Sequence, residues 1–364
     1  MKQVTNLTLT RLNSFILRGI HPRSVGFEIP RHEHKTITLS HGAGGSLTHK
    51  LISDVIIKTL GNVYLNRLDD SAVIKELPAR HHIAFTTDAY IVEPVFFPGG
   101  DIGRLAVCGT VNDLSTAGAV PKYLSLSLII EAGFDLGQFK KIVVSIKEAA
   151  EESGVKVVTG DTKVLPKERG GSIYINTSGI GFVPDCLDIS SHNAKASDVI
   201  IVSGTMGDHE AAILNARENL QLKTTLKSDV APINHTIAKI LKKTPKINCL
   251  KDLTRGGLAG ALIEIATHSR CQIQIDEQKI PVRREVAGIC DLVGLDPLYL
   301  ANEGKFVVVC AKKESATVLS VLKKNAAVIG EVTSIKKPEL LLKTAGGGIR
   351  RLHMMSASQL PRIC

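Results

Sequence analysis

Short valine- and isoleucine-rich runs alternate along the chain with longer amphipathic or alanine-rich stretches. The runs at 83–87 and 155–158 have the length and composition of strands. Residues 139–153 between them have the apolar spacing of a helix. The apolar positions on its predicted buried face are Ile142, Val143, Ile146 and Ala150. Strands interleaved with helices predict an α/β or α+β fold.

The second half of the chain repeats this alternation. A strand at 199–202 runs into a tight turn at 204–208, and we expect Asp208 to cap a helix that starts near His209. The change of pattern at 184–195 predicts a domain boundary there.

A length of 364 residues is typical of two domains. We expect an N-terminal α/β domain at 36–188 and a C-terminal α+β domain at 189–344. Residues 1–35 are polar and aperiodic, so we interpret them as a flexible extension. Residues 345–364 begin with a glycine-rich hinge and are interpreted as a mobile tail.

The composition is ordinary for a globular protein, with 44% apolar and 22% charged residues. A formal net charge of +10 raises the question of a nucleic-acid partner. Aromatic residues make up only 4% of the chain and tryptophan is absent, which argues against stacking on bases. Because lysine and arginine are also scattered, we interpret the charge as a solvated surface and expect no nucleic-acid partner.

The seven cysteines form no CxxC pair and lack zinc-finger spacing, so neither a disulfide framework nor a zinc module is predicted. Unpaired cysteines suit the reducing cytoplasm. No window of the sequence approaches the ~20 apolar residues that a membrane-spanning helix needs. We therefore expect a cytoplasmic protein with no membrane partner.

A glycine-rich loop at 41–46 lies between a strand-like segment at 36–39 and a helical stretch that begins at Leu47. Bare backbone N–H groups at Gly44 and Gly45 could face a phosphate. The alternative is a strand-to-helix turn that needs glycine only for its conformation. The spacing matches neither the Walker nor the Rossmann pattern.

Aspartates recur at the ends of predicted strands. They are Asp69, Asp70, Asp88, Asp113 and Asp161. Each one could simply form a turn. Several carboxylates in comparable contexts instead favour a magnesium–nucleotide site, because Mg²⁺ is commonly shared between one or two carboxylates and substrate phosphates. The metal-binding candidates are Asp70, Asp88, Asp113 and Asp161.

Eight segments between 41 and 364 together resemble the HypE family of hydrogenase maturation factors, which are carbamoyl dehydratases. They are PVFFPGGDIGRLAVCGTVNDL at 94–114, HGAGG at 41–45, LDDSAV at 68–73, TTDAY at 86–90, VTGDTKV at 158–164, LTRGG at 253–257, LDPLYLANEG at 295–304 and PRIC at 361–364. They follow the family's order along almost the whole chain. The sequence departs from the family's usual pattern at Glu210, where glycine is usual, and at Leu253, where proline is usual.

The resemblance implies the fold of aminoimidazole ribonucleotide synthetase, selenophosphate synthetase and thiamine-monophosphate kinase. In that fold an N-terminal α/β domain dimerises and builds the ATP site, and an α+β domain follows. The implied activity is the ATP-dependent dehydration of an S-carbamoyl group on Cys364 to a thiocyanate, which supplies cyanide ligands to the iron of NiFe hydrogenase. The implied cofactors are ATP and Mg²⁺. The implied partners are a second copy of the chain, the carbamoyltransferase HypF and the HypC–HypD iron scaffold.

By the same resemblance, Lys163 and Glu303 lie near the reacting Cys364, as a charge stabiliser and a general base. The implied nucleotide-binding positions are Gly44, Gly45, Asp69, Asp70, Asp88, Asn112, Asp113, Gly160, Asp161, Thr162, Asp252 and Arg255. Simpler interpretations stay open. Lys163 could be a surface lysine, Glu303 a solvated carboxylate or a partner of Lys305, and the turn before residue 258 a plain helix start.

The chemistry of the residues agrees with this implication. An amide oxygen is a very poor leaving group, and phosphorylation by ATP makes it a good one. The tail follows the glycines at 346–348 and ends at Cys364, so a mobile arm could move the thiol from one binding site to another. The alternative is an incidental frayed terminus. Another enzyme of the superfamily and a non-catalytic assembly protein are the competing functions. The absence of cysteine before Cys108 argues against selenophosphate synthetase.

Overall fold

The computed structural model describes residues 35–355, apart from 43–45, 69–71, 73, 75–76, 167–172, 218–221, 223, 323–324 and 335–336. Apart from Lys35, the predicted N-terminal extension lies outside the described residues, as do residues 356–364 of the predicted tail. The prediction that the mobile tail begins at 345 is wrong. Ile349–Leu352 form a strand that pairs with Glu339–Lys343, and the glycines at 346–348 lie in the turn between these two strands instead of forming a hinge.

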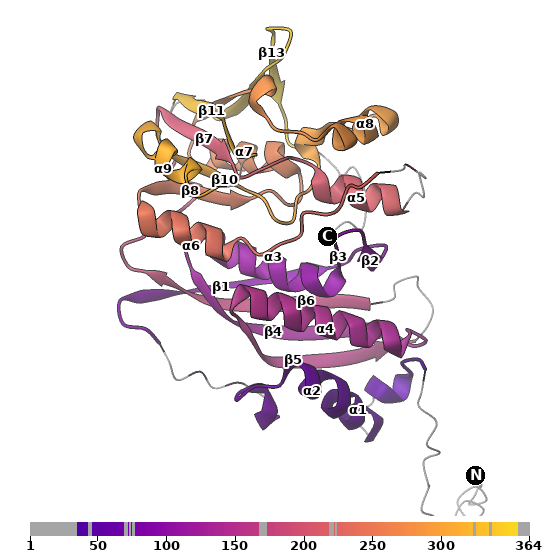
Figure 1. Cartoon of the computed structure of the whole chain (residues 1–364). Coiled ribbons are helices and arrows are strands. Elements are labelled where there is room, and N and C mark those ends of the chain that lie inside the picture. Colours follow the sequence, from indigo (N-terminus) through magenta and orange to yellow (C-terminus); the bar gives the residue numbers. More distant parts are fainter. Residues whose placement is uncertain are drawn as a thin grey trace, which may run out of the picture. The chain divides into compact units, whose positions relative to one another are not determined.

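The first part of the chain forms a four-stranded mixed sheet in the order β1-β6-β4-β5. Only the pair β4 and β5 is parallel. The strands are β1 (His81–Tyr90), β4 (Val120–Glu131), β5 (Lys156–Leu165) and β6 (Ile173–Pro184). Helices α3 (Ile102–Thr116) and α4 (Leu136–Ser153) lie side by side over one face of this sheet (Figure 1). A short hairpin, β2 (Phe96–Phe97) and β3 (Gly100–Asp101), precedes α3.

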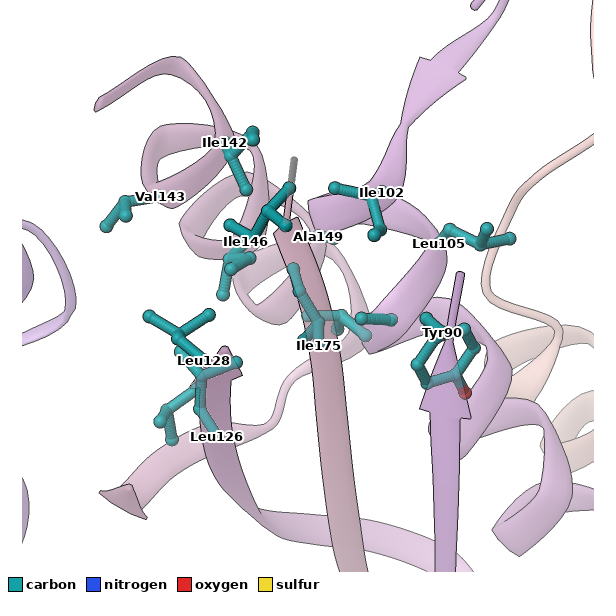
Figure 2. Close-up of a cluster of buried hydrophobic side chains, with 14 of the residues drawn as sticks. Tyr90, Ile102, Leu105, Leu126, Leu128, Ile142, Val143, Ile146, Ala149 and Ile175 are labelled. Atoms are coloured by element: carbon teal, nitrogen blue, oxygen red, sulfur yellow. The ribbon is translucent and has the colours of Figure 1, made fainter. Parts of the chain in front are cut away.

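Helix α4 confirms the helix predicted at 139–153. It begins after Asp135, whose carboxylate accepts the Gln138 N–H at 2.7 Å, and it ends at Gly154, whose φ is 71°. Its predicted apolar face is buried against α3 and the sheet, as Figure 2 shows for Ile142 and Ile146 beside Leu128 and Ile175. The hydrophobic pattern therefore sufficed to orient this helix.

A chain of buried hydroxyl groups fixes α3 on the sheet. Tyr90 Oη lies 3.2 Å from Thr110 Oγ1, which lies 2.6 Å from Thr177 Oγ1. Thr177 donates to the Ala106 carbonyl at 2.9 Å. The Tyr90 ring sits directly over Gly109, where an added Cβ would collide with it. This packing sets the height of the later residues of α3, Asn112 and Asp113, above the sheet.

The short helices before β1 are η1 (Leu39–Gly42), α1 (Ser46–Leu51), the π-helix η2 (Ile52–Ile57), α2 (Lys58–Leu60) and η3 (Leu65–Arg67). The strand predicted at 36–39 is wrong. Thr36 forms only an isolated bridge with Asp135, and a 3₁₀ helix begins at Leu39. Both the N–H and the hydroxyl of Thr38 bond to His41 Nδ1, and this local bonding favours a turn over an extended strand.

The second part of the chain contains a seven-stranded sheet in the order β13-β12-β9-β11-β7-β10-β8. Its strands are β7 (Asp198–Val202), β8 (Ile247–Asp252), β9 (Gln272–Asp276), β10 (Phe306–Ala311), β11 (Ala327–Ser334), β12 (Glu339–Lys343) and β13 (Ile349–Leu352). The helices are α5 (Asp208–Arg217), α6 (Asn234–Lys243), α7 (Gly257–His268), α8 (Arg284–Val293) and α9 (Ser315–Leu319), with 3₁₀ turns η4 (Glu277–Lys279), η5 (Pro297–Tyr299) and η6 (Lys312–Glu314). All of β7 is buried, because α7 covers one face of the sheet and α6 the other.

The predicted cap at Asp208 is also wrong. Asp208 is the first residue of α5, and its carboxylate accepts from the Thr205 hydroxyl at 2.5 Å and pairs with Arg283 and Lys305. One of its oxygens, Oδ1, is buried without a hydrogen-bond partner among the described atoms. Ionic pairing in the interior has replaced helix capping at this residue.

Candidate active site

Hydrogen bonds hold α3 against the segment that follows α5. The Asn112 side-chain amide donates to the carbonyls of Ala231 and Glu303, each at 3.2 Å, and its oxygen accepts the Ile233 N–H at 2.9 Å. Arg104, two turns earlier, donates to the Val230 carbonyl at 3.2 Å. This junction brings the loop that carries Glu303 next to α3 and β8.

Four acidic residues converge at the junction, each from a different element. Asp88 comes from β1, Asp113 from α3, Asp252 from the end of β8, and Glu303 from the loop between η5 and β10. Each of the last three has its pKa raised by the charge of at least one other member. The expected convergence is thus confirmed for Asp88 and Asp113. The expected location of Asp113 at a strand end is wrong, because it lies in a helix.

Glu303 is 3% exposed, and its backbone is held on both sides. Its N–H donates to Asp229 Oδ1 at 3.0 Å, and its carbonyl also accepts the Ala231 N–H at 3.3 Å. Burial raises the pKa of the Glu303 carboxyl well above its usual range, and the charges of Asp252 and the other acidic neighbours raise it further. The carboxyl therefore keeps its proton at pH values where an ordinary glutamate is ionised.

Both simpler interpretations of Glu303 are wrong. A buried side chain is not a solvated loop carboxylate. Lys305 pairs instead with Asp229 at 2.9 Å and with Asp208 at 3.8 Å.

The carboxyl groups of Asp252 and Asp113 lie near Glu303, and the pKa values of both are raised. Burial, reinforced by Asp113, raises the pKa of Asp252 to about 7, and Lys251 offsets part of this rise. Burial raises the pKa of Asp113 too. The Thr86 hydroxyl, which donates to its carboxylate at 3.0 Å, lowers this pKa in part. Arg255 and Lys251 are the cations that act on Asp113. Positive charge therefore borders the cluster from the β8–α7 turn.

The β8–α7 turn and the Glu303 loop are built as one unit. Gly256 and Gly257 have φ values of 79° and 58°, and an added Cβ at Gly257 would lie 2.5 Å from the Leu300 carbonyl oxygen. The Asn302 N–H donates to the Leu253 carbonyl at 2.9 Å. Helix α7 starts directly after this turn, at Gly257, and its first N–H groups have no side-chain cap. Leu253 is fully buried in the hydrophobic core beneath this turn.

Lys163 and Asp161 lie away from this cluster. In the strand register Asp161 pairs with Ser127, whereas Asp88 aligns through Thr177 and Leu126 with Gly160. Because side chains alternate along a strand, Asp161 and Lys163 point to the face of the sheet that α3 and α4 leave open. Lys163 Nζ lies 3.0 Å from Asp161 Oδ2, and this pairing, acting first through a hydrogen bond, lowers the pKa of Asp161. Thr162 points inward and is 9% exposed.

Within the described part of the chain, no three histidine, cysteine, aspartate or glutamate side chains form a group that could hold a metal ion. This does not conflict with a magnesium–nucleotide site, because Mg²⁺ needs only one or two carboxylates when phosphates and water fill its other positions. The pair Asp88 and Asp113 fits that requirement. Gly44, Gly45, Asp69, Asp70 and Cys364 lie outside the described residues.

Sequence reasoning missed Asp229 and Asn302. Asp229 lies in a stretch without a motif, and Asn302 belongs to the LDPLYLANEG segment but has no residue type that singles it out. Their importance comes from contacts distant in the sequence, which no local pattern reveals. No helix in the described residues has the length and apolar character required to cross a membrane.

Comparisons with known proteins agree with the motifs. Residues 68–183 match the N-terminal domain, and residues 195–343 the C-terminal domain, of AIR synthase related proteins. The carbamoyl dehydratase HypE of Cupriavidus necator is 43% identical over 333 residues, which cover 90% of this chain and 95% of that protein.

Solved structures of relatives agree as well. The structure of a HypE in complex with ATP has a TM-score of 0.86 at 42% identity and covers 90% of this chain and 100% of its own. A HypE–HypF complex has a TM-score of 0.73 at 44% identity, covering 84% of this chain and 99% of that chain.

The raised pKa of Asp252 predicts a pH-dependent stability. Unfolded aspartate is ionised above about pH 4, while folded Asp252 keeps its proton up to about pH 7. In this interval the folded state binds more protons, so the free energy of unfolding falls as the pH rises. Asp252→Asn should therefore be more stable than wild type at pH 8 by up to about 4 kcal/mol, and the difference should vanish near pH 4. Urea unfolding at both pH values measures this. The exposed Asp291→Asn should show no such trend, and a pH-independent gain in Asp252→Asn would contradict the assignment.

Proposed function

The chain belongs to the HypE family of carbamoyl dehydratases, and from this premise we propose that it uses Mg–ATP to dehydrate a carbamoyl group on the sulfur of Cys364 to a thiocyanate during hydrogenase maturation. The observation that carries the proposal is the buried Glu303 carboxyl, rigidly held at the acidic junction and with a pKa far above its usual range. Such a carboxyl in a dry site is suited to move protons.

The reaction converts R–S–C(=O)–NH₂ into R–S–C≡N. The C–O bond must break, both N–H protons must leave, and the sulfur stays bound throughout. Mg–ATP would supply the phosphoryl group that turns the carbamoyl oxygen into a leaving group. Loss of phosphate and of the protons then creates the triple bond, so one ATP takes up the water that is removed.

Glu303, in its ionised form, would accept one of the two nitrogen protons, and the departing phosphate would take the other. Burial among like charges makes the ionised form of its carboxyl an unusually strong base, which suits removal of a proton from nitrogen. Its fixed backbone supports this role, because a general base must be held within hydrogen-bond reach of the proton it takes.

We place the nucleotide beside this carboxyl, with Asp88 and Asp113 as metal ligands and the uncapped start of α7 and Arg255 as phosphate contacts. The proposed contacts from other segments are Gly44, Gly45, Asp69, Asp70, Asn112, Gly160, Thr162 and Asp252. Asp161 points to the opposite face of the sheet and would contact a nucleotide only from a paired copy of the chain. ATP binding by the 42% identical relative supports this placement. It agrees with the chemistry of the donors, since carboxylate oxygens suit Mg²⁺ and backbone N–H groups suit phosphate.

We propose that two copies of the chain pair through the open face of the four-stranded sheet. Phe85 is 68% exposed and Ile83 59%, and both lie on this face with Lys163 and Asp161. Two neighbouring apolar side chains exposed to this extent favour a face that a partner covers. Coverage would also enclose Lys163, which as a solvated lysine could contribute little to stabilising developing negative charge. Sedimentation velocity on the purified chain tests the pairing.

HypF would load the carbamoyl group, and the HypC–HypD scaffold would receive the cyanide, both in the cytoplasm. The HypE–HypF complex of a 44% identical relative supports the first partner. The tail follows Met355, and nine further residues end at Cys364, a span of up to about 30 Å when extended. That reach supports transfer of the sulfur between a partner and the junction.

The first prediction concerns the thiol. A Cys186→Ala background removes the exposed thiol of the described chain, and cyanate then carbamoylates Cys364 without HypF. Intact mass should show an adduct that loses the mass of one water only when Mg–ATP is added. Cys364→Ala should bind ATP normally and give no such product. Delivery of cyanide by Cys364→Ala to the HypC–HypD scaffold would refute the carrier role.

The second prediction separates chemistry from binding. Glu303→Gln and Lys163→Ala should slow single-turnover water loss from the carbamoylated protein by about 10²-fold or more, because both act on the transition state. The Kd for ATP should stay within about threefold of wild type. The exposed Glu285→Gln serves as the control. Equal losses in rate and ATP affinity would move the residue concerned to the nucleotide site.

The third prediction concerns the metal. Asp88→Asn should weaken ATP binding by about tenfold at limiting Mg²⁺, because the metal loses an anionic ligand, and have little effect without the metal. Titration calorimetry measures both. Asp161→Asn, on the open face, is the informative comparison: a similar loss would place that carboxylate at the same metal. Unchanged affinity in Asp88→Asn would remove Asp88 from the site.

A further inference from the structure

Glu210 joins the first turn of α5 to the loop that carries Glu303. The Ala301 N–H donates to Glu210 Oε2 at 2.7 Å, and the Glu210 N–H donates back to the Ala301 carbonyl at 3.2 Å. Both hydrogen bonds therefore connect the same two residues and form a closed clamp. Glu210 is 5% exposed and Ala301 3%, so water does not readily replace either bond.

The clamp lies two residues from Glu303, on a loop with little freedom elsewhere. Asn302 is fully buried; its side-chain oxygen accepts the Gly207 N–H at 2.8 Å, and its own N–H is bonded to Leu253. Asp229 and Asn112 hold the backbone of Glu303 itself. A loop held at successive residues transmits a displacement at Ala301 to the Glu303 carboxyl instead of absorbing it.

The surroundings of Glu210 explain how a carboxylate can serve here. The residues that follow it on α5, Ala211 and Ala212, pack in a small apolar cluster with Leu300 and with residues of α8. Two titratable groups interact with Glu210 electrostatically. The charge of Arg217 of α5 lowers the pKa of Glu210, and the charge of Glu210 raises the pKa of Cys290 of α8. Burial raises the pKa of Glu210 to about 6, although the hydrogen bond from the Ala301 N–H and the charge of Arg217 lower it. The carboxylate is therefore ionised, and accepts most strongly, at neutral pH.

We infer that in this chain Glu210, which stands where the family usually has glycine, is a positioning residue for Glu303. It clamps Ala301 and so holds the Glu303 carboxyl at the place where the substrate nitrogen must arrive. It touches no reacting atom. The inference rests on the proposed function for its consequence, while the clamp itself can be tested separately. An error of one ångström in the position of a catalytic group is enough to lower a rate about 10²-fold.

The test compares Glu210→Ala, which removes the acceptor, with Glu210→Gln, which retains an oxygen acceptor of the same length. Glu210→Ala should slow single-turnover water loss by about tenfold or more, with an unchanged Kd for ATP and faster hydrogen exchange in the peptide containing Ala301. Glu210→Gln should restore both within about threefold. The exposed Glu285→Ala is the matched control on the neighbouring helix.

The pH dependence gives a second measurement that needs no variant. After correction for the intrinsic rate, exchange of the Ala301 peptide in wild type should become faster as the pH falls through about 6, because protonation weakens the acceptor. In Glu210→Gln this change should be absent. It remains measurable if Glu210→Ala fails to fold.

Normal water loss by a folded Glu210→Ala would overturn the inference. A rate of hydrogen exchange in the Ala301 peptide that changes neither with pH nor with the substitution would overturn it too. If no variant, wild type included, loses water, the proposed function fails. The exchange measurements still decide whether Glu210 holds the loop.

Discussion

The mutual repulsion of carboxyl groups at the junction of the two sheets is the constraint that the surrounding structure has to withstand. Asp88, Asp113, Asp252 and Glu303 come from elements far apart in the sequence, and burial strengthens the repulsion among them. The chain holds them with hydrogen bonds directed mostly at backbone atoms, from Asn112, Asp229 and Asn302. Because such bonds fix the path of the chain, the side chains cannot escape by a local adjustment. Neutralisation by protons or by a bound cation is the remaining response, and the raised pKa values of Asp113, Asp252 and Glu303 reflect this repulsion.

A site of this kind violates the usual preference for paired or solvated charges, and such violations concentrate at functional positions. The neighbouring cluster of Asp208, Asp229, Arg283 and Lys305 follows the preference instead, with each carboxylate paired to a cation. The two clusters share Asp229, which faces Lys305 with one oxygen and the Glu303 N–H with the other. The paired cluster thus anchors the unpaired one.

Sequence patterns predicted α4, whose burial has a clear period, and the strands that begin at His81 and Asp198, which short runs of β-branched and aromatic residues mark. They were wrong where a local side-chain contact dominates, as His41 does at residues 36–39. They also misplaced Asp113, because α3 is apolar on nearly all sides and lacks a helical period. Motifs identified Glu303 and Asp88, but only the strand register reveals that Lys163 and Asp161 face the opposite side of the sheet. Asp229 and the clamp by Glu210 depend on contacts between distant segments, which leave no local signal.

Asn112 and Asp113 are neighbours on α3, yet one holds the Glu303 loop and the other belongs to the acidic cluster. One turn of α3 therefore sets the positions of two groups. They are the carboxylate of Asp113, proposed to hold the nucleotide's metal, and the carboxyl of Glu303, proposed to accept the proton. The Glu303 loop is also fixed to the second sheet through the bond of Asn302 to Leu253, so a tilt of the two sheets would have to break the bonds of Asn112. The spacing between the proposed sites of phosphoryl transfer and proton removal therefore depends on Asn112, which sets it only while the junction is closed.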